Sequence, residues 1–187
     1  MCPMLQMMQA VYVWFYALNL WKAIAIALTA VLLWSLLGVM LRKRHGKLWR
    51  LLNLVALAAA ITVISHATLF RTATGRNLIL QPFYTWIRAQ ENQEAYRELL
   101  MNVILFVPFG LTMPHILPQR WKTGNRVGLT IAFGFTFSVA LEFAQYLFCV
   151  GTTETDDVLS NTLGVLAGML QLPVFVLMQR AFYKKKE

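Results

Sequence analysis

The sequence has little charge for its length: Asp, Glu, Lys and Arg make up only 13% of its 187 residues. A soluble globular domain carries about 25% of such residues, and 58% of this chain is apolar. The composition therefore effectively excludes a water-soluble enzyme.

Cysteine is also scarce: Cys2 and Cys149 are the only two. Two cysteines do not build a disulfide framework, and no CxxC or Cys/His spacing typical of a zinc site is present, so we expect neither a metal site nor a cofactor.

Long apolar runs take the place of the missing charge and predict an all-α, polytopic bundle of transmembrane helices. Five runs come close to the roughly 20 residues that a helix needs to cross a bilayer. These runs cover residues 23–41, 51–70, 99–117, 127–148 and 158–179. We interpret the uncharged residues 1–21 as an N-terminal interfacial helix, with a sixth span as the alternative. The whole chain, residues 1–187, is expected to form a single membrane domain.

The formal charge of +9 is distributed as a topology signal and does not indicate a nucleic-acid-binding protein. Lys and Arg gather in residues 42–50, in residues 118–126 and in the C-terminal tail. The positive-inside rule places these segments, including the C-terminus, in the cytoplasm. Segments 71–98 and 149–157 are balanced or acidic, so we expect them outside the cell. The first of them contains a stretch typical of a short re-entrant or interfacial element.

Glu142 is the only acidic residue inside a predicted span. A charge at mid-bilayer costs roughly 2.5–3.5 kcal/mol even on the gentler insertion scales. Ser138, Gln145 and Cys149 share its helical face, because the four residues follow an i, i+4, i+7, i+11 pattern. We therefore expect this face to point into the bundle and away from lipid.

Acidic residues mark the start of the fifth span, where Asp157 lies in register with Asn161, Gly164 and Gly168. A small-xxx-small pair lets another helix approach closely, and we assign Gly164 and Gly168 that structural role. Asp156 has two open interpretations, because an Asp can cap a helix N-terminus or contact a ligand.

The second and third spans add further polar and structural residues. On the third span, Pro108 removes one backbone donor and clashes with the carbonyl four residues earlier, which predicts a kink near mid-membrane. Asn102 precedes this proline and Gly110 follows it. On the second span, Thr62, Ser65 and His66 form a polar patch at i, i+3 and i+4 near the predicted outer end.

These polar side chains come from four helices and share one depth. The predicted orientation and a rise of about 1.5 Å per residue place them in the outer half of the membrane, whereas the inner halves are mostly Leu, Val, Ala and Phe. A channel or proton path would leave polar residues through the full thickness, so we expect one outward-facing polar pocket that is closed below. The predicted ligand-binding residues are Asn102, Glu142, Gln145, Asp156, Asp157, Asn161 and His66.

The order and spacing of these residues resemble the VanZ-like family of bacterial membrane proteins, over a region of about 71–170. The motifs are Asn102-xxx-Phe106-x-Pro108-x-Gly110, Glu142-xx-Gln145 and Glu154-xx-Asp157-xxx-Asn161-xx-Gly164-xxx-Gly168. The resemblance implies a bacterial cell-membrane protein associated with resistance to teicoplanin, a lipoglycopeptide that binds peptidoglycan precursors. Many members carry an arginine after the glycine corresponding to Gly151, where this chain has Thr152.

Three functions follow from these observations. The leading hypothesis is a pocket that binds an amphiphile: a membrane lipid, a lipid-linked cell-wall precursor or a lipoglycopeptide antibiotic. The second is an intramembrane enzyme that acts on such a precursor, with Glu142 as general acid or base and Asp157 as its charged partner. The third is a structural role, in which Glu142 is protonated and hydrogen-bonded to Gln145 or Asn102 between helices.

Overall fold

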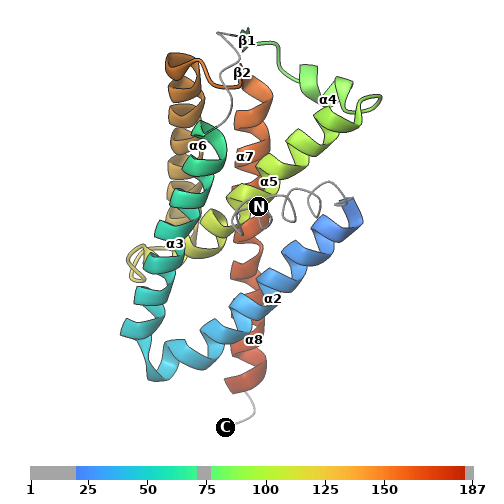
Figure 1. Cartoon of the computed structure of the whole chain (residues 1–187). Coiled ribbons are helices and arrows are strands. Elements are labelled where there is room, and N and C mark those ends of the chain that lie inside the picture. Colours follow the sequence, from blue (N-terminus) through green and yellow to red (C-terminus); the bar gives the residue numbers. More distant parts are fainter. Residues whose placement is uncertain (1–19, 71–76, 184–187) are drawn as a thin grey trace, which may run out of the picture.

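The computed structural model describes residues 20–70 and 77–183. The predicted N-terminal interfacial helix falls on residues 1–19 and therefore lies outside the described residues, apart from its last two positions. The described helices form one bundle, with two short strands at one end (Figure 1). In chain order, the elements are α2 (Leu20–Arg44), α3 (Gly46–Leu69), β1 (Asn77–Ile79), α4 (Tyr84–Arg88), α5 (Gln93–Ile116), α6 (Thr123–Phe148), β2 (Thr152–Glu154), α7 (Thr155–Met169) and α8 (Gln171–Tyr183).

Five helical segments within the described residues are long and apolar enough to cross a membrane, which confirms the five predicted spans. α7 and α8 together make the fifth, Thr155–Gln179, so the single helix expected there is divided at Leu170. The sequence explains this division, because Pro173 has no N–H to donate to the carbonyl of Met169, where α7 ends. Proline is tolerated in the first turn of the helix that follows.

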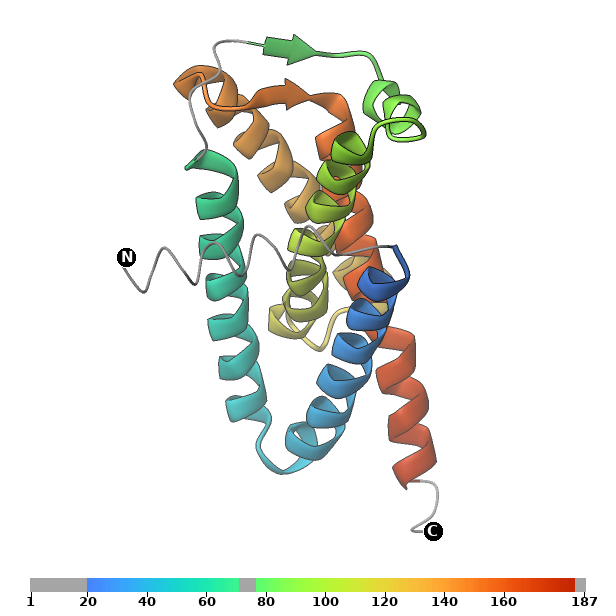
Figure 2. The same cartoon turned by 45° about the vertical axis from the view of Figure 1, so that its right-hand side comes forward.

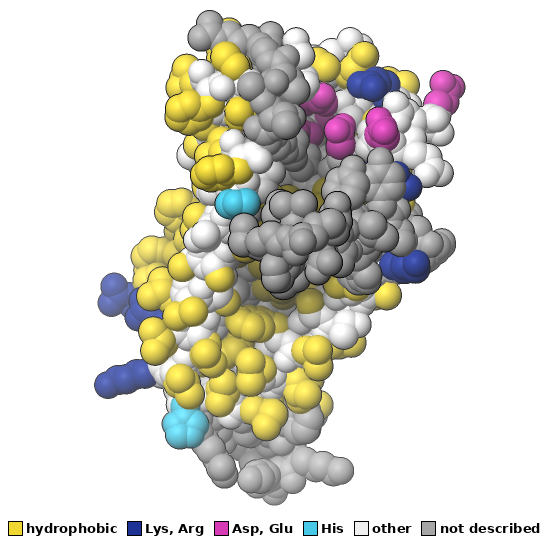
Figure 3. Space-filling view, in the orientation of Figure 1, with side chains coloured by type: hydrophobic (Ala, Val, Ile, Leu, Met, Phe, Trp, Pro, Cys, Tyr) yellow, Lys and Arg dark blue, Asp and Glu magenta, His cyan; other side chains and the backbone are white. Residues whose placement is uncertain are grey.

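Apolar side chains cover much of the outside of the bundle. Leu33 of α2 is 61% exposed, Val63 of α3 is 56% exposed and Phe143 of α6 is 61% exposed. Figure 3 shows hydrophobic side chains over α2 and α3, whereas Asp and Glu gather near the end that carries the strands. Exposed apolar surface of this extent marks contact with a membrane, so the chain is a membrane protein.

α5 and α7 pack against each other at the centre of the bundle, and three glycines make this contact possible. A Cβ on Gly110 would lie 2.1 Å from the carbonyl oxygen of Val165 on α7, and a Cβ on Gly164 would lie 2.1 Å from that of Val103 on α5. A Cβ on Gly168 would lie 2.2 Å from the carbonyl oxygen of Val107. The prediction of a close helix approach at Gly164 and Gly168 is confirmed. α5 continues as a helix through Pro108.

A two-stranded parallel sheet joins the two connectors that were expected outside the membrane. β1 pairs with β2 in the register Asn77 with Thr152, Leu78 with Thr153 and Ile79 with Glu154. The sequence analysis predicted helices alone, so this sheet adds to the predicted fold. The strands lie across the top of the bundle beside α4 (Figure 2). We call this the sheet end; the basic end is the opposite one, where the α2–α3 turn lies and Arg42 of α2 contacts Gln119 of the α5–α6 connection.

Candidate functional site

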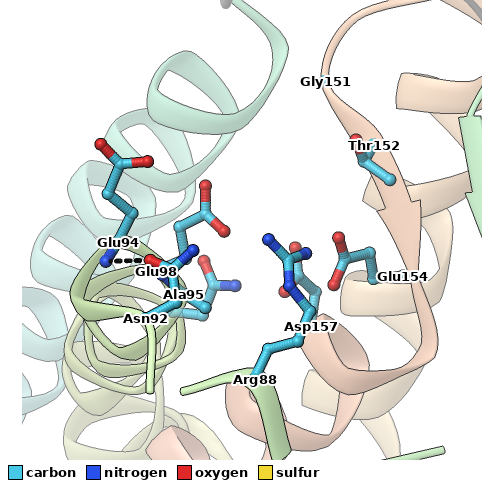
Figure 4. Close-up of a pocket in the computed structure, with 10 residues that line it drawn as sticks. Arg88, Asn92, Glu94, Ala95, Glu98, Gly151, Thr152, Glu154 and Asp157 are labelled. Carbon is cyan, nitrogen blue, oxygen red and sulfur yellow. Dashed lines mark hydrogen bonds between the residues drawn. The ribbon is translucent and has the colours of Figure 1, made fainter. Parts of the chain in front are cut away.

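A cavity of about 330 Å³ opens at the sheet end between the α4–α5 segment and the β2–α7 segment. Its volume lies within the usual range for small-molecule sites. Figure 4 shows the side chains of both segments facing each other across this space. The lining residues are Arg88, Asn92, Glu94, Ala95, Glu98, Asn102, Gly151, Thr152, Glu154 and Asp157.

The cavity is strongly acidic. Four carboxylates line it against one guanidinium, which gives a formal charge of −3 when all are ionised. Figure 4 shows Arg88 extending into the space between Glu98 on α5 and the side formed by Glu154 and Asp157. Residues 20–70 and 77–183 contain no group of three His, Cys, Asp or Glu side chains placed to hold a metal ion. Figure 4 shows the carboxylates on both sides of the cavity, with Glu94 and Glu98 on one side and Glu154 and Asp157 on the other.

Asp156 lies behind the wall of the cavity and supports it, but it is not one of the lining residues. Its carboxylate is 1% exposed and accepts hydrogen bonds from the backbone N–H groups of Phe83 and Thr85, both at 2.6 Å. Phe83 precedes α4 in a left-handed conformation, with a φ of 64°, and provides no side-chain cap. Asp156 therefore caps α4, a neighbouring helix, where the sequence analysis considered only its own helix or a ligand. The Thr85 hydroxyl donates to the Glu154 carboxylate and ties β2 to the same corner.

Glu142 also supports the cavity wall, because it holds β2 in place. Its side-chain Oε2 accepts a hydrogen bond of 3.0 Å from the backbone N–H of Glu154, and its backbone carbonyl accepts one of 3.3 Å from the Thr153 hydroxyl. The side chain is 7% exposed, which confirms that this face of α6 points into the bundle. Glu142 does not line the cavity, whereas Asp157, its partner in the enzyme hypothesis, does.

Asn161 and Gln145 form contacts between helices. The Asn161 amide on α7 donates to the Ser138 hydroxyl on α6 at 2.8 Å. The Gln145 amide on α6 donates to the Thr68 carbonyl of α3 at 3.2 Å. Polar side chains at such positions join transmembrane helices, and these two residues do so through their amide N–H groups. Their side-chain oxygens are buried without a hydrogen-bond partner within the described residues.

Of the seven predicted ligand-binding residues, Asn102 and Asp157 line the cavity. Asn102 is 4% exposed, and it lines the inner part of the cavity wall on α5. His66 is exposed and stacks on Phe70, with ring centroids 4.8 Å apart, and it is not among the lining residues.

Several lining residues were missed by the sequence analysis. Glu94 and Glu98 were assigned to a connector, because the third span was taken to begin at residue 99. The helix begins at Gln93, and Asn92 caps it by accepting a hydrogen bond of 2.8 Å from the Glu94 N–H. Glu94, Glu98 and Asn102 therefore follow an i, i+4, i+8 pattern on one face, which is the signal that was available. Arg88 also lines the cavity and was likewise assigned to the connector.

A second buried polar cluster lies near the basic end, among inner halves that were predicted to be mostly apolar. Ser35, Asn53 and Gln171 are fully buried and His115 is 3% exposed. The Gln171 amide donates to the Leu111 carbonyl at 3.0 Å and lies 2.6 Å from His115 Nε2. Ser35 donates to the carbonyls of Val31 and Gln171, and Asn53 accepts from the Trp34 indole and donates to the Trp49 carbonyl. Gln171 Oε1 is buried without a hydrogen-bond partner within the described residues.

The comparison with known proteins agrees with the motif pattern. The family model described as VanZ/LLP1 matches residues 51–176, a range that contains every residue lining the cavity. The chain is also similar to Protein VanZ of Enterococcus faecium, with 34% identity over 93 residues. This alignment covers 49% of the chain and 52% of the relative, so it spans about half of the relative's length. No solved structure matches. The chain belongs to the VanZ/LLP1 family.

Proposed function

We propose that this VanZ-family membrane protein binds the polar headgroup of a cell-envelope amphiphile in the acidic cavity at the sheet end. The cavity itself carries the proposal, because it combines four carboxylates, one guanidinium and the buried Asn102 amide in about 330 Å³. Such a set of convergent polar groups is typical of a ligand site. The sheet end faces the outside of the cell in the predicted orientation.

The surroundings of the cavity suit the apolar part of an amphiphile. Phe83 is 59% exposed, Ile87 is 62% exposed and Trp86 is 38% exposed on the α4 segment that forms one rim. Aromatic and aliphatic side chains in this position are typical of a membrane interface. A ligand with its headgroup in the cavity would thus place its chain along α4 and the outer surfaces of the spans.

The charge of the cavity selects among headgroups. A formal charge of −3 attracts amino groups and repels an isolated phosphate, although Arg88 offers one contact for an anion. A lipid-linked cell-wall precursor or a lipoglycopeptide antibiotic combines many hydrogen-bonding groups with an apolar chain. We therefore propose that the protein contributes to teicoplanin-type glycopeptide resistance, by sequestering the antibiotic or by altering its access to the membrane.

Direct binding tests this function. Purified protein in lipid nanodiscs is titrated with teicoplanin and, separately, with a lipid-linked peptidoglycan precursor. Asp157→Asn and Glu98→Gln are expected to weaken the binding of an amine-bearing headgroup by about tenfold each, as expected for the loss of a charge-assisted hydrogen bond. Glu91→Gln is the matched control, because Glu91 is exposed and does not line the cavity.

The Arg88→Gln variant distinguishes the two headgroup chemistries. Removal of the guanidinium makes the cavity more negative, so binding through an amino group becomes tighter and binding through a phosphate becomes weaker. Equal affinity of all four variants and the unchanged protein for both ligands would contradict the proposal. Teicoplanin susceptibility of bacteria producing each variant then links binding to protection.

A further inference from the structure

The acidic and basic residues of this protein are segregated to opposite ends of the bundle. Seven of the eight acidic residues lie in the described part of the chain, and the eighth, Glu187, lies outside it. Those seven belong to the α4–α5 segment, to the end of α6 that contacts β2, or to the start of α7; they are Glu91, Glu94, Glu98, Glu142, Glu154, Asp156 and Asp157. The arginines of the basic end therefore have no carboxylate near them within the described residues.

Two of these arginines converge on one neutral atom. Arg42 near the end of α2 donates a hydrogen bond of 3.0 Å to the side-chain oxygen of Gln119. Arg126 in the first turns of α6 donates to the same oxygen. Two guanidinium groups that share one acceptor repel each other, and a neutral amide oxygen offsets this repulsion only weakly.

The burial of Arg126 distinguishes this arginine pair from the exposed basic residues on the same connection. Arg126 is 8% exposed, and its Nε is buried without a hydrogen-bond partner within the described residues. Arg120 and Lys122, by contrast, are exposed on the same connection. The positive-inside pattern explains exposed, solvated charges, but it does not explain why a guanidinium is buried beside another one.

The surrounding structure adds positive potential and an apolar side. The N-terminus of α6 has no acidic residue in its first turn, and its N-cap residue Lys122 makes no side-chain cap, so the dipole of this helix is uncompensated. Arg42 lies over the ring of Phe175 on α8, at 5.3 Å from the centroid. Gln119 is exposed, so the residue that accepts from both arginines lies at the surface of the bundle.

We infer that Arg42, Arg126 and Gln119 form a phosphate site that takes the headgroup of an anionic phospholipid. A phosphate oxygen in the position of the Gln119 amide oxygen would pair with both guanidinium groups, and arginine binds phosphate in two-point geometry. Basic pockets between transmembrane helices on the cytoplasmic side are typical lipid-headgroup sites. The site lies at the end of the spans, where bilayer phosphates are present at high density, and this favours a phospholipid over free phosphate. It is separate from the acidic cavity.

Retention of lipid by the purified protein tests the inference. The protein in detergent is mixed with phosphatidylglycerol or with zwitterionic phosphatidylcholine, and the bound lipid is counted by native mass spectrometry. We expect retention of phosphatidylglycerol and a loss of about tenfold in Arg42→Gln and Arg126→Gln. Arg120→Gln removes the same charge from an exposed position and is expected to retain the lipid.

Gln119→Glu keeps the test decisive if the arginine variants fold poorly. A carboxylate at residue 119 would occupy the site from within, so this variant should melt at a higher temperature than the unchanged protein without added lipid. It should also lose the rise in melting temperature that phosphatidylglycerol produces. Equal lipid retention by Arg126→Gln and the unchanged protein, or an unaltered lipid response of Gln119→Glu, would overturn the site. Full displacement of phosphatidylglycerol by millimolar inorganic phosphate would overturn the assignment to a lipid headgroup.

Discussion

Gly164→Ala should lower the stability of this protein more than any conservative change on its surface. The added Cβ would lie 2.1 Å from the carbonyl oxygen of Val103 and 2.9 Å from Cβ of Phe106. Ordinary contact begins at 3.4 Å, so α5 and α7 must separate by about 1.3 Å at this point. The nearest atom belongs to the backbone and has no rotamer by which to move away.

The expected magnitude follows from two opposing effects. Overpacking of a well-packed interior costs roughly 1–3 kcal/mol, and the upper part of this range applies because backbone atoms collide. Replacement of glycine by alanine inside a helix returns up to about 1 kcal/mol through helix propensity. We therefore expect the free energy of unfolding to fall by about 1–2 kcal/mol.

Unfolding in mixed micelles, with helix content followed by circular dichroism at increasing SDS, measures this change. Gly128→Ala is the matched control, because a Cβ on Gly128 would meet no atom within 4 Å. This control should gain about 0.5–1 kcal/mol from helix propensity. Equal unfolding midpoints for the two variants would refute the close contact of α5 and α7. Because Asn102 adjoins Val103 and both helices line the cavity, Gly164→Ala should also weaken teicoplanin binding.

Three further predictions concern the walls and surroundings of the cavity. Asp156→Ala leaves the buried N–H groups of Phe83 and Thr85 without their acceptor, which should cost about 1–3 kcal/mol and speed amide hydrogen exchange of α4. Glu142→Gln retains an oxygen that can accept from the Glu154 N–H, so its unfolding midpoint should stay close to that of the unchanged protein, whereas Glu142→Ala should show a clear loss. His66→Ala removes an exposed ring stacked on Phe70, and teicoplanin binding and susceptibility should both stay unchanged.

The spans and the helix contacts were predictable because their causes are local and periodic. A run of apolar residues specifies a span by its length, and small residues at i and i+4 specify a face that a neighbour can approach. The interior position of Glu142 followed from the same periodicity. The predicted start of α5 came too late, because Glu98 ends the uncharged run that defined the span. Asn92, which caps the helix, marks its true start.

The sheet and the wall of the cavity depend on contacts that are distant in the sequence. Asn77 pairs with Thr152, and the sequence of neither segment contains a periodic pattern that predicts this pairing. The sequence offered Asp156 as a cap of its own helix, but the helix that it caps precedes it by about 70 residues in the chain. Local rules identify a capping residue; the tertiary fold decides which helix end it meets.

The arrangement of polar groups along the bundle is consistent with the proposed binding function and differs from what a transport path requires. Ile64, Phe106 and Val165 are fully buried and pack in one cluster. Along their helices they lie between the residues of the sheet end, such as Asn102 and Asn161, and the cluster that contains Gln171. A conducting path needs polar groups or water at every depth, and these three side chains fill the middle of the bundle with hydrocarbon. The buried polar residues near the basic end therefore do not continue the cavity. They hold the helices together below an apolar layer, and this separation supports the proposed binding site at the sheet end.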